Sequence, residues 1–191
     1  MFHPALSIPN ILTYGRILAV PAVVACFYYP GDFSRWVALG LFVIAAITDF
    51  FDGYLARAWS QQSSLGRMLD PIADKLLVSA CLLMLAADGT ISGWSLWAAI
   101  IILCREILVS GLREFLAELR VSVPVTQVAK WKTTVQMLAL GFLLVGPAGE
   151  VVLPGTVTIG LWLLWVSALI TLYTGYDYFR VGVSHLIGEN Q

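Results

Sequence analysis

The segment DFFDGYLARAWSQQSSLGRMLDPIAD, residues 49–74, places the four aspartates Asp49, Asp52, Asp70 and Asp74 between long apolar stretches. An aspartate at the centre of a membrane helix costs about 2.5–3.5 kcal/mol. Four such carboxylates without compensation would cost on the order of 10 kcal/mol, as much as the stability of a whole domain. We therefore expect positive charge to lie between them.

The composition is that of an integral membrane protein. Of the 191 residues, 59% are hydrophobic and only 12% are charged, whereas soluble domains carry about 25% charged residues. The net charge of -1 provides no basic field for nucleic acid. The three cysteines, Cys26, Cys81 and Cys104, lack metal-ligand spacing and are expected to be small buried hydrophobes. We expect no cleaved signal peptide, since no Lys or Arg precedes the first apolar stretch.

Apolar stretches long enough to cross a membrane predict an all-α, polytopic protein with six transmembrane helices in a single domain, residues 1–191. The expected spans lie near residues 10–29, 36–58, 68–87, 93–115, 127–146 and 156–180. Turn signals such as Pro30-Gly31 and Asp88-Gly89 separate them. The residues before the first span are expected to form a short interfacial helix.

Basic residues fall on one side of this six-span arrangement, with only Arg35 on the other. Because loops on the cytoplasmic side collect Lys and Arg, we expect both termini in the cytoplasm. Asp49 precedes Arg57 by eight residues, which places it about 12 Å inside the cytoplasmic end of its helix. The acids would then line a recess near the cytoplasmic surface of the membrane.

The spacing of the acids places them on two helix faces. Asp49 and Asp52 are three residues apart, and Asp70 and Asp74 are four apart, so each pair shares a face. A short connection makes the two helices antiparallel neighbours, which lets all four carboxylates converge. Carboxylates without nearby histidine or thiolate suit Mg²⁺ or Mn²⁺, and two ions are the natural filling.

Small residues accompany the acids at Gly53, Ala56 and Gly66. They are open to two interpretations, since small residues allow tight helix packing and also make room for a substrate against the backbone. Arg57 and the interleaved acids favour the second interpretation.

The pattern Asp49-x2-Asp52-Gly53-x2-Ala56-Arg57-x8-Gly66-x3-Asp70-x3-Asp74 resembles the full signature of the CDP-alcohol phosphatidyltransferase family. The resemblance implies a six-helix membrane enzyme, usually dimeric, that uses divalent metal to transfer a phosphatidyl group from CDP-diacylglycerol to an alcohol with release of CMP. It implies that Asp49, Asp52, Asp70 and Asp74 bind metal and that Asp74 is the general base. It also implies that the residues holding the cytidine diphosphate are Gly53, Ala56, Arg57 and Gly66.

Further stretches resemble one branch of this family, the bacterial phosphatidylglycerophosphate synthases, whose acceptor is sn-glycerol 3-phosphate. These stretches are Ile8-Pro9-Asn10-Ile11-Leu12-Thr13-x2-Arg16, Arg105-Glu106-x5-Gly111-Leu112-Arg113-Glu114 and Lys130-Trp131-Lys132-Thr133-Thr134-x-Gln136. Together with the acidic motif they run through most of the chain.

An anionic acceptor is also favoured by the placement of basic residues. Arg105 and Arg113 lie two turns apart on roughly one helix face, and Lys130 and Lys132 open the next span on the same side. They would form a phosphate pocket, to which Arg16 would contribute. Alternatively, the arginines pair with neighbouring glutamates and the lysines attract anionic lipid headgroups.

Asn10, Thr13 and Arg16 recur at i, i+3 and i+6 near the cytoplasmic end of the first helix. We expect Asn10 and Thr13 to close the CDP-diacylglycerol side, with helix packing as an equal alternative.

Two rival functions remain open at this point. A family member could use inositol phosphate, serine or an existing phospholipid as acceptor. A cation transporter would also place acids in a membrane, but its acids should lie near the midplane and its halves should be related. The sequence shows neither feature.

Overall fold

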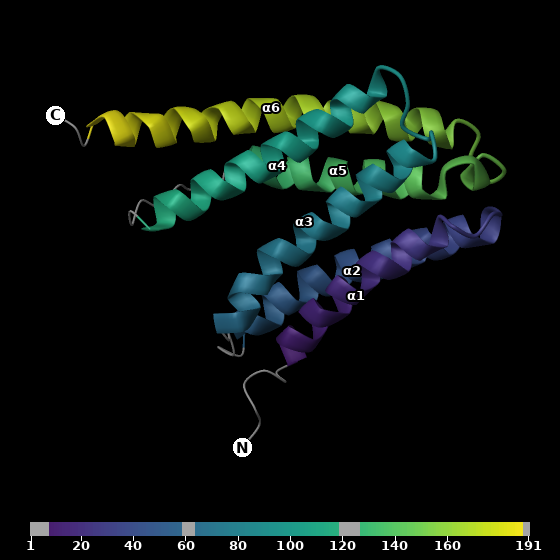
Figure 1. The fold of residues 1–191 in the computed structure, drawn as a ribbon, viewed down its shortest axis with the longest axis horizontal. Coiled ribbons are helices and arrows are strands. Elements are labelled where there is room, and N and C mark those ends of the chain that lie inside the picture. Colours follow the sequence, from purple (N-terminus) through teal and green to yellow (C-terminus); the bar gives the residue numbers. More distant parts are fainter. Residues whose placement is uncertain (1–7, 59–63, 119–126, 189–191) are drawn as a thin grey trace. The chain divides into compact units, whose positions relative to one another are not determined.

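The computed structural model describes residues 8–58, 64–118 and 127–188, and within these ranges the chain forms helices and no strand (Figure 1). The elements are α1 (Ile8–Cys26), α2 (Asp32–Ala58), α3 (Ser64–Ala87), α4 (Ser95–Glu118), α5 (Gln127–Val145), the 3-10 helix η2 (Gly146–Gly149) and α6 (Thr156–Gly188). The all-α class and the six long helices are thereby confirmed. The proposed interfacial helix before residue 8 lies outside the described residues.

The helix ends follow local chemistry more than hydropathy. α2 begins at Asp32, four residues before the apolar span, where the Ser34 hydroxyl donates to the carbonyls of Tyr29 and Gly31 at 2.7 Å each. An acid in the first turn also suits the positive end of the helix dipole. Gly89 adopts φ +82°, a conformation that favours glycine, in the turn after α3.

The helices form two compact units. Unit 1 comprises the described residues up to Thr90 together with Leu140–Val157, and unit 2 comprises Ile91–Ala139 and the described residues from Thr158 onward. In unit 1, α1 packs against both α2 and α3. Among the described side chains of α2, the buried ones are Ala38, Phe42 and Ala45, spaced four and three apart as on one helix face.

Unit 2 buries a comparable stripe along α4, formed by Ala98, Ile102 and Val109. Arg105 occupies the position of this stripe between Ile102 and Val109. The buried face of α6 is partly polar, since it includes Ser167, Thr171 and Thr174 as well as Leu164 and Ala168. Arg105 of α4 therefore belongs to the same unit as the buried hydroxyl groups of α6.

Among the described residues, two helices are long and apolar enough to cross a membrane, Ser95–Ala117 and Thr156–Arg180, and Asn10–Cys26 is a shorter apolar helix. Only 22% and 33% of the apolar windows of the two long helices are buried inside the protein. Large apolar side chains on them, such as Ile107 and Trp162, are exposed. Core helices of soluble proteins bury their apolar faces, so these helices are suited to contact lipid.

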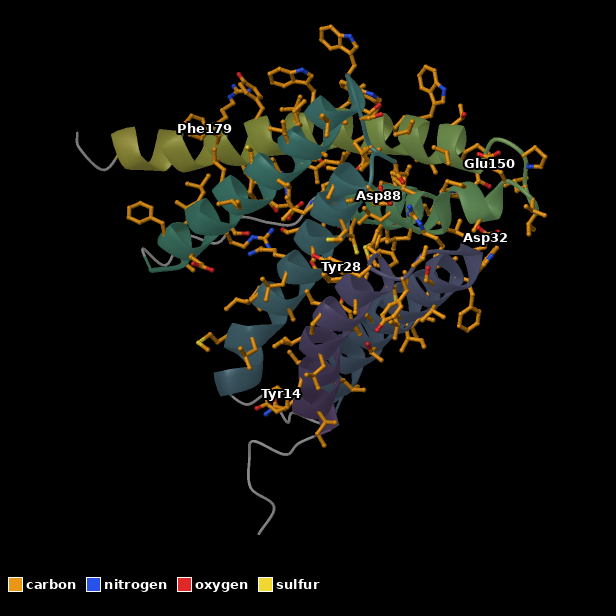
Figure 2. The ribbon with its side chains drawn as sticks, turned by 45° about the vertical axis from the view of Figure 1, so that its right-hand side comes forward. Tyr14, Tyr28, Asp32, Asp88, Glu150 and Phe179 are labelled. Carbon is orange, nitrogen blue, oxygen red and sulfur yellow. The ribbon has the colours of Figure 1, made fainter. Side chains whose placement is uncertain are left out.

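Arg35 joins several elements at one end of unit 1. Its Nη2 forms an ion pair with Asp88, its Nη1 donates to the Leu144 carbonyl at 3.4 Å, and its guanidinium lies 4.9 Å from the centre of the Phe27 ring. Asp88 lies at this end together with Asp32 and Glu150, whereas Tyr14 lies toward the other end of the unit (Figure 2). The Arg35 cluster (Arg35, Asp88, Phe27 and Leu144) thus ties α2 to three other parts of unit 1.

Glu150 caps the start of α6. Its carboxylate accepts hydrogen bonds from the backbone N–H groups of Gly155 at 2.6 Å and Val157 at 2.9 Å. The first N–H groups of a helix have no partner within the helix, so this carboxylate satisfies donors that would otherwise need water. These bonds, from Val157 first and then Gly155, lower the pKa of Glu150.

Candidate active site

The four acids of the motif lie on consecutive helices of unit 1, Asp49 and Asp52 in α2, Asp70 and Asp74 in α3. Both helices pack against α1. The side chains of Asp49 and Asp74 are described, and those of Asp52 and Asp70 lie outside the described residues. The predicted helical placement of the motif is therefore confirmed.

Asp49 has a cationic partner from α1. Arg16 Nη1 lies 2.5 Å from Asp49 Oδ1. The Arg16 side chain is only 1% exposed, whereas that of Asp49 is 45% exposed. A buried guanidinium thus pairs with a carboxylate that is partly accessible to solvent, which meets part of the expectation that positive charge lies among the acids.

Asn10 and Thr13 continue the buried polar stripe that ends at Arg16. All three side chains are buried, and they follow one another at i, i+3 and i+6 on α1. α1, which carries these three side chains, packs against α2 and α3, and it belongs to the same unit as the four aspartates of the motif. Their predicted role at the CDP-diacylglycerol remains a prediction.

A divalent cation is compatible with the donors of this motif. Its acids are hard oxygen ligands, and Asp49 already accepts a positively charged partner through one oxygen. No group of three or more histidine, cysteine or acidic side chains that could hold a metal occurs among the described side chains, which exclude Asp52 and Asp70. Metal binding by the complete set therefore stays a prediction.

A second charged cluster lies in unit 2. Arg105 Nη1 lies 3.5 Å from Glu106 Oε1, and Lys132 Nζ of α5 forms an ion pair with the same carboxylate oxygen. Both Arg105 and Lys132 are largely buried. The sequence left open that Arg105 pairs with a neighbouring glutamate. Its contact with Glu106 is such an ion pair, and it is one of several contacts that Arg105 makes.

Arg105 and Arg113 share a partner on α6. The guanidinium carbons of Arg105 and Arg113 lie 5.9 and 5.5 Å from the centre of the Tyr178 ring. Arg113 Nη2 donates to the Tyr178 hydroxyl at 3.1 Å, and Arg105 Nη2 donates to Thr174 Oγ1 at 3.0 Å. This confirms that the two arginines, eight residues apart, lie on a common face of α4.

Sequence reasoning missed Thr174 and Tyr178. A threonine and a tyrosine four residues apart in a long apolar helix give no signal by themselves, since such residues are ordinary in membrane spans. The available signal was Arg105 on α4, because a cation on a largely buried helix face needs acceptors from a neighbouring element.

The remaining predicted site residues cannot be placed by their side chains. For five of them the structure describes only the backbone, as part of a helix: Gly53, Ala56, Arg57, Gly66 and Lys130.

Comparison with known proteins gives a family and close relatives. Residues 6–173 match the family model described as CDP-alcohol phosphatidyltransferase. A Rickettsia bellii protein named CDP-diacylglycerol--glycerol-3-phosphate 3-phosphatidyltransferase is 46% identical over 174 residues, which are 91% of this chain and 94% of the relative. Proteins of the same name are similar at 41% identity in Cereibacter sphaeroides and 40% in Shigella flexneri serotype 5b, each over 96% of this chain and 98% of the relative.

Proposed function

The chain belongs to the CDP-alcohol phosphatidyltransferase family, and we propose that it transfers the phosphatidyl group of CDP-diacylglycerol to sn-glycerol 3-phosphate, giving phosphatidylglycerol phosphate and CMP. The observation that carries this proposal is the set of relatives at 40–46% identity over at least 91% of the chain, whose names state this donor and this acceptor. The chain is accordingly an enzyme of phospholipid biosynthesis.

Unit 1 holds the residues for the donor. We assign Asp49, Asp52, Asp70 and Asp74 to divalent metal, Mg²⁺ or Mn²⁺, with two ions in the site. When bound, such ions compensate the charge of a diphosphate and align nucleophile and leaving group. The ion pair of Arg16 with Asp49 supports this assignment, because it shows that the motif accepts positive charge.

The nucleotide belongs to the same unit. Gly53, Ala56, Arg57 and Gly66 are assigned to the cytidine diphosphate, with Asn10 and Thr13 of α1 beside them. The burial of Asn10 and Thr13 on a helix that packs against both motif helices supports their part in this assignment. The lipid chains of the donor stay in the bilayer.

Asp74 is assigned as general base. The hydroxyl of glycerol 3-phosphate must lose its proton as it attacks phosphorus, and a carboxylate within reach can take that proton. Metal charge keeps a carboxylate ionised and weakens it as a base, so this role requires that Asp74 carry a small share of the metal charge.

We assign Arg105, Arg113, Lys130 and Lys132 to the acceptor phosphate. Of the charged side chains joined by described contacts, Arg105, Arg113 and Lys132 are positive and Glu106 is negative. These four side chains carry a net charge of +2, which favours an anionic ligand. Arginine forks suit phosphate oxygens, and a lysine adds point charge.

Arg16 is a further candidate for a substrate phosphate. Its ion pair with Asp49 places this positive charge at the acidic motif, where a phosphate would gain from it.

In the membrane we propose six spans, with both termini and the motif at the cytoplasmic side of a bacterial inner membrane, and a homodimer as the assembly. The concentration of basic residues on one side of the six helices supports this orientation. The exposed apolar side chains of α4 and α6 support contact with lipid.

A panel of labelled acceptors tests the proposal. Purified protein in detergent receives CDP-diacylglycerol, Mg²⁺ and either labelled sn-glycerol 3-phosphate, inositol phosphate or serine. Label should enter the lipid fraction with glycerol 3-phosphate alone. Labelled lipid from another acceptor and none from glycerol 3-phosphate would assign the chain to a different branch of the family.

A further inference from the structure

The side chain of Arg105 is held along its length by α6. A Cβ atom at Gly175 would lie 3.1 Å from Arg105 Cγ, so the aliphatic part of the arginine runs close against the α6 backbone. At its end, Nη2 donates to Thr174 Oγ1 at 3.0 Å. Two successive residues of α6 therefore fix both the stem and the head of this side chain.

The acceptor atom of Thr174 is itself fixed. The Thr174 hydroxyl donates to the carbonyl of Ile170 at 3.0 Å or of Thr171 at 3.2 Å. Because its proton is used within α6, the oxygen faces Arg105 as an acceptor. Thr174 is buried, so water does not compete for this bond.

Tyr178, one turn farther along α6, contacts both arginines. Its ring is 4% exposed, it lies within 6 Å of both guanidinium carbons, and its hydroxyl accepts from Arg113 at 3.1 Å. Arg105 and Arg113 are separated by about 12 Å along α4. A single aromatic ring thus contacts two like charges on the neighbouring helix, and a ring face attracts cations.

We propose that Thr174, Gly175 and Tyr178 form a seat on α6 that positions Arg105 and Arg113 for the phosphate of the acceptor. This inference rests on the proposed function, because it takes the two arginines to be ligands of glycerol 3-phosphate. The seat residues act through the arginines and do not themselves bind substrate. Free arginine side chains lose rotamer entropy when they bind a ligand, and a seat that orders them beforehand removes that cost from binding.

The test is a set of conservative variants read by steady-state kinetics. Tyr178→Phe keeps the ring and removes the hydroxyl, and Thr174→Val keeps the shape and removes the acceptor. Each should raise KM for glycerol 3-phosphate by about tenfold, the effect of losing one hydrogen bond to a charged group. The values of kcat and of KM for CDP-diacylglycerol should stay within about twofold of wild type. Thr174→Ser, which retains the hydroxyl, should restore the wild-type KM.

Tyr176→Phe is the matched control. Tyr176 lies on the same helix and is 66% exposed, so loss of its hydroxyl should change neither KM. Tyr178→Leu should raise KM for glycerol 3-phosphate more than Tyr178→Phe, because it also removes the ring from both guanidinium groups.

Variants of the arginines separate failure of the seat from failure of the proposed function. If Arg105→Gln raises KM for glycerol 3-phosphate while Tyr178→Phe and Thr174→Val leave it unchanged, the seat is refuted and the acceptor site stands. A parallel rise of both KM values in the seat variants would reveal a merely structural role and would also refute the inference. If Arg105→Gln and Arg113→Gln leave KM for glycerol 3-phosphate unchanged, the acceptor assignment fails and the seat fails with it.

Discussion

Arg16 Nη1 of α1 lies 2.5 Å from Asp49 Oδ1 of α2, and the arginine is almost fully buried while the aspartate is nearly half exposed. Burial of an unpaired guanidinium would be costly, so this contact determines where Arg16 can lie. It also joins the first helix to the first acid of the motif. The first helix is therefore part of the acidic centre of unit 1 and not only a neighbour in packing.

Replacement of Arg16 should destabilise the protein. Arg16→Met keeps much of the side-chain volume but removes the guanidinium that pairs with Asp49, and we expect a loss of about 2 kcal/mol in unfolding free energy. Arg16→Lys keeps the charge and should lose less. Thermal unfolding in detergent measures both, and added Mg²⁺ should recover more stability in Arg16→Met than in wild type, since a bound cation replaces the lost charge. Equal stability of Arg16→Met and wild type would contradict this account.

The ion pair of Arg35 and Asp88 should contribute to stability beyond its charge. Arg35→Gln and Asp88→Asn should each lower the unfolding free energy by about 1 kcal/mol, because the two side chains are only 21% and 19% exposed and Arg35 makes several contacts at once. The reversed pair, Arg35→Asp with Asp88→Arg, should not restore wild-type stability. An aspartate at position 35 cannot donate to the Leu144 carbonyl or contact the Phe27 ring as a cation does. Full recovery in the reversed pair would show that charge alone matters.

Stability should depend on pH through Glu150. Its pKa is lowered in the folded protein by hydrogen bonds from the Val157 and Gly155 N–H groups. The resulting stabilisation is fully present above the ordinary glutamate pKa and is lost as pH falls through the lowered, folded-state value. Glu150→Gln, which has one acceptor oxygen instead of two, should have a lower Tm than wild type at neutral pH. This difference should shrink as the pH is taken below the ordinary pKa, and a difference that stays constant with pH would contradict the cap.

Glu106 should be needed to keep two cations buried. Glu106→Gln leaves Arg105 and Lys132 without their shared carboxylate, and we expect a loss of about 2–3 kcal/mol in unfolding free energy. An added anion can replace the carboxylate, so inorganic phosphate should raise the Tm of Glu106→Gln more than that of wild type. Glu114→Gln is the control, since Glu114 is exposed on the same helix. The same Tm increment in Glu106→Gln and wild type would contradict the replacement of the Glu106 carboxylate by the anion.

The helices were predictable because a run of about 20 apolar residues has the length and composition of a helix that can cross a bilayer. The expected span 127–146 and the observed α5 differ by a single residue at one end. α2 begins earlier than its apolar stretch because Ser34 and Asp32 organise its first turn, and α6 continues to Gly188, past the end of the apolar stretch. Hydropathy locates the apolar part of a helix and does not register such extensions.

The charged contacts were less predictable than the residues that make them. The spacing of Arg105 and Arg113 indicated a common face. It did not indicate that both would contact Tyr178, which follows Arg105 by 73 residues and Arg113 by 65. In the predicted six-span arrangement, Arg35 was the one basic residue on the side opposite the others. Its partner Asp88 lies 53 residues away in the sequence, so spacing did not indicate the pair. Such pairs depend on which helices pack together, and spacing along one helix carries no information about that.

The most direct test of the central claim is product formation by purified protein supplied with CDP-diacylglycerol, glycerol 3-phosphate and Mg²⁺, with and without a chelator. We predict phosphatidylglycerol phosphate and CMP in equal amounts, no product in chelator, recovery when Mg²⁺ is restored in excess, and no turnover in a folded, membrane-inserted Asp74→Asn variant. Equal turnover with chelator present, or substantial turnover by Asp74→Asn, would contradict the assignment of the acids to a metal-dependent phosphatidyl transfer.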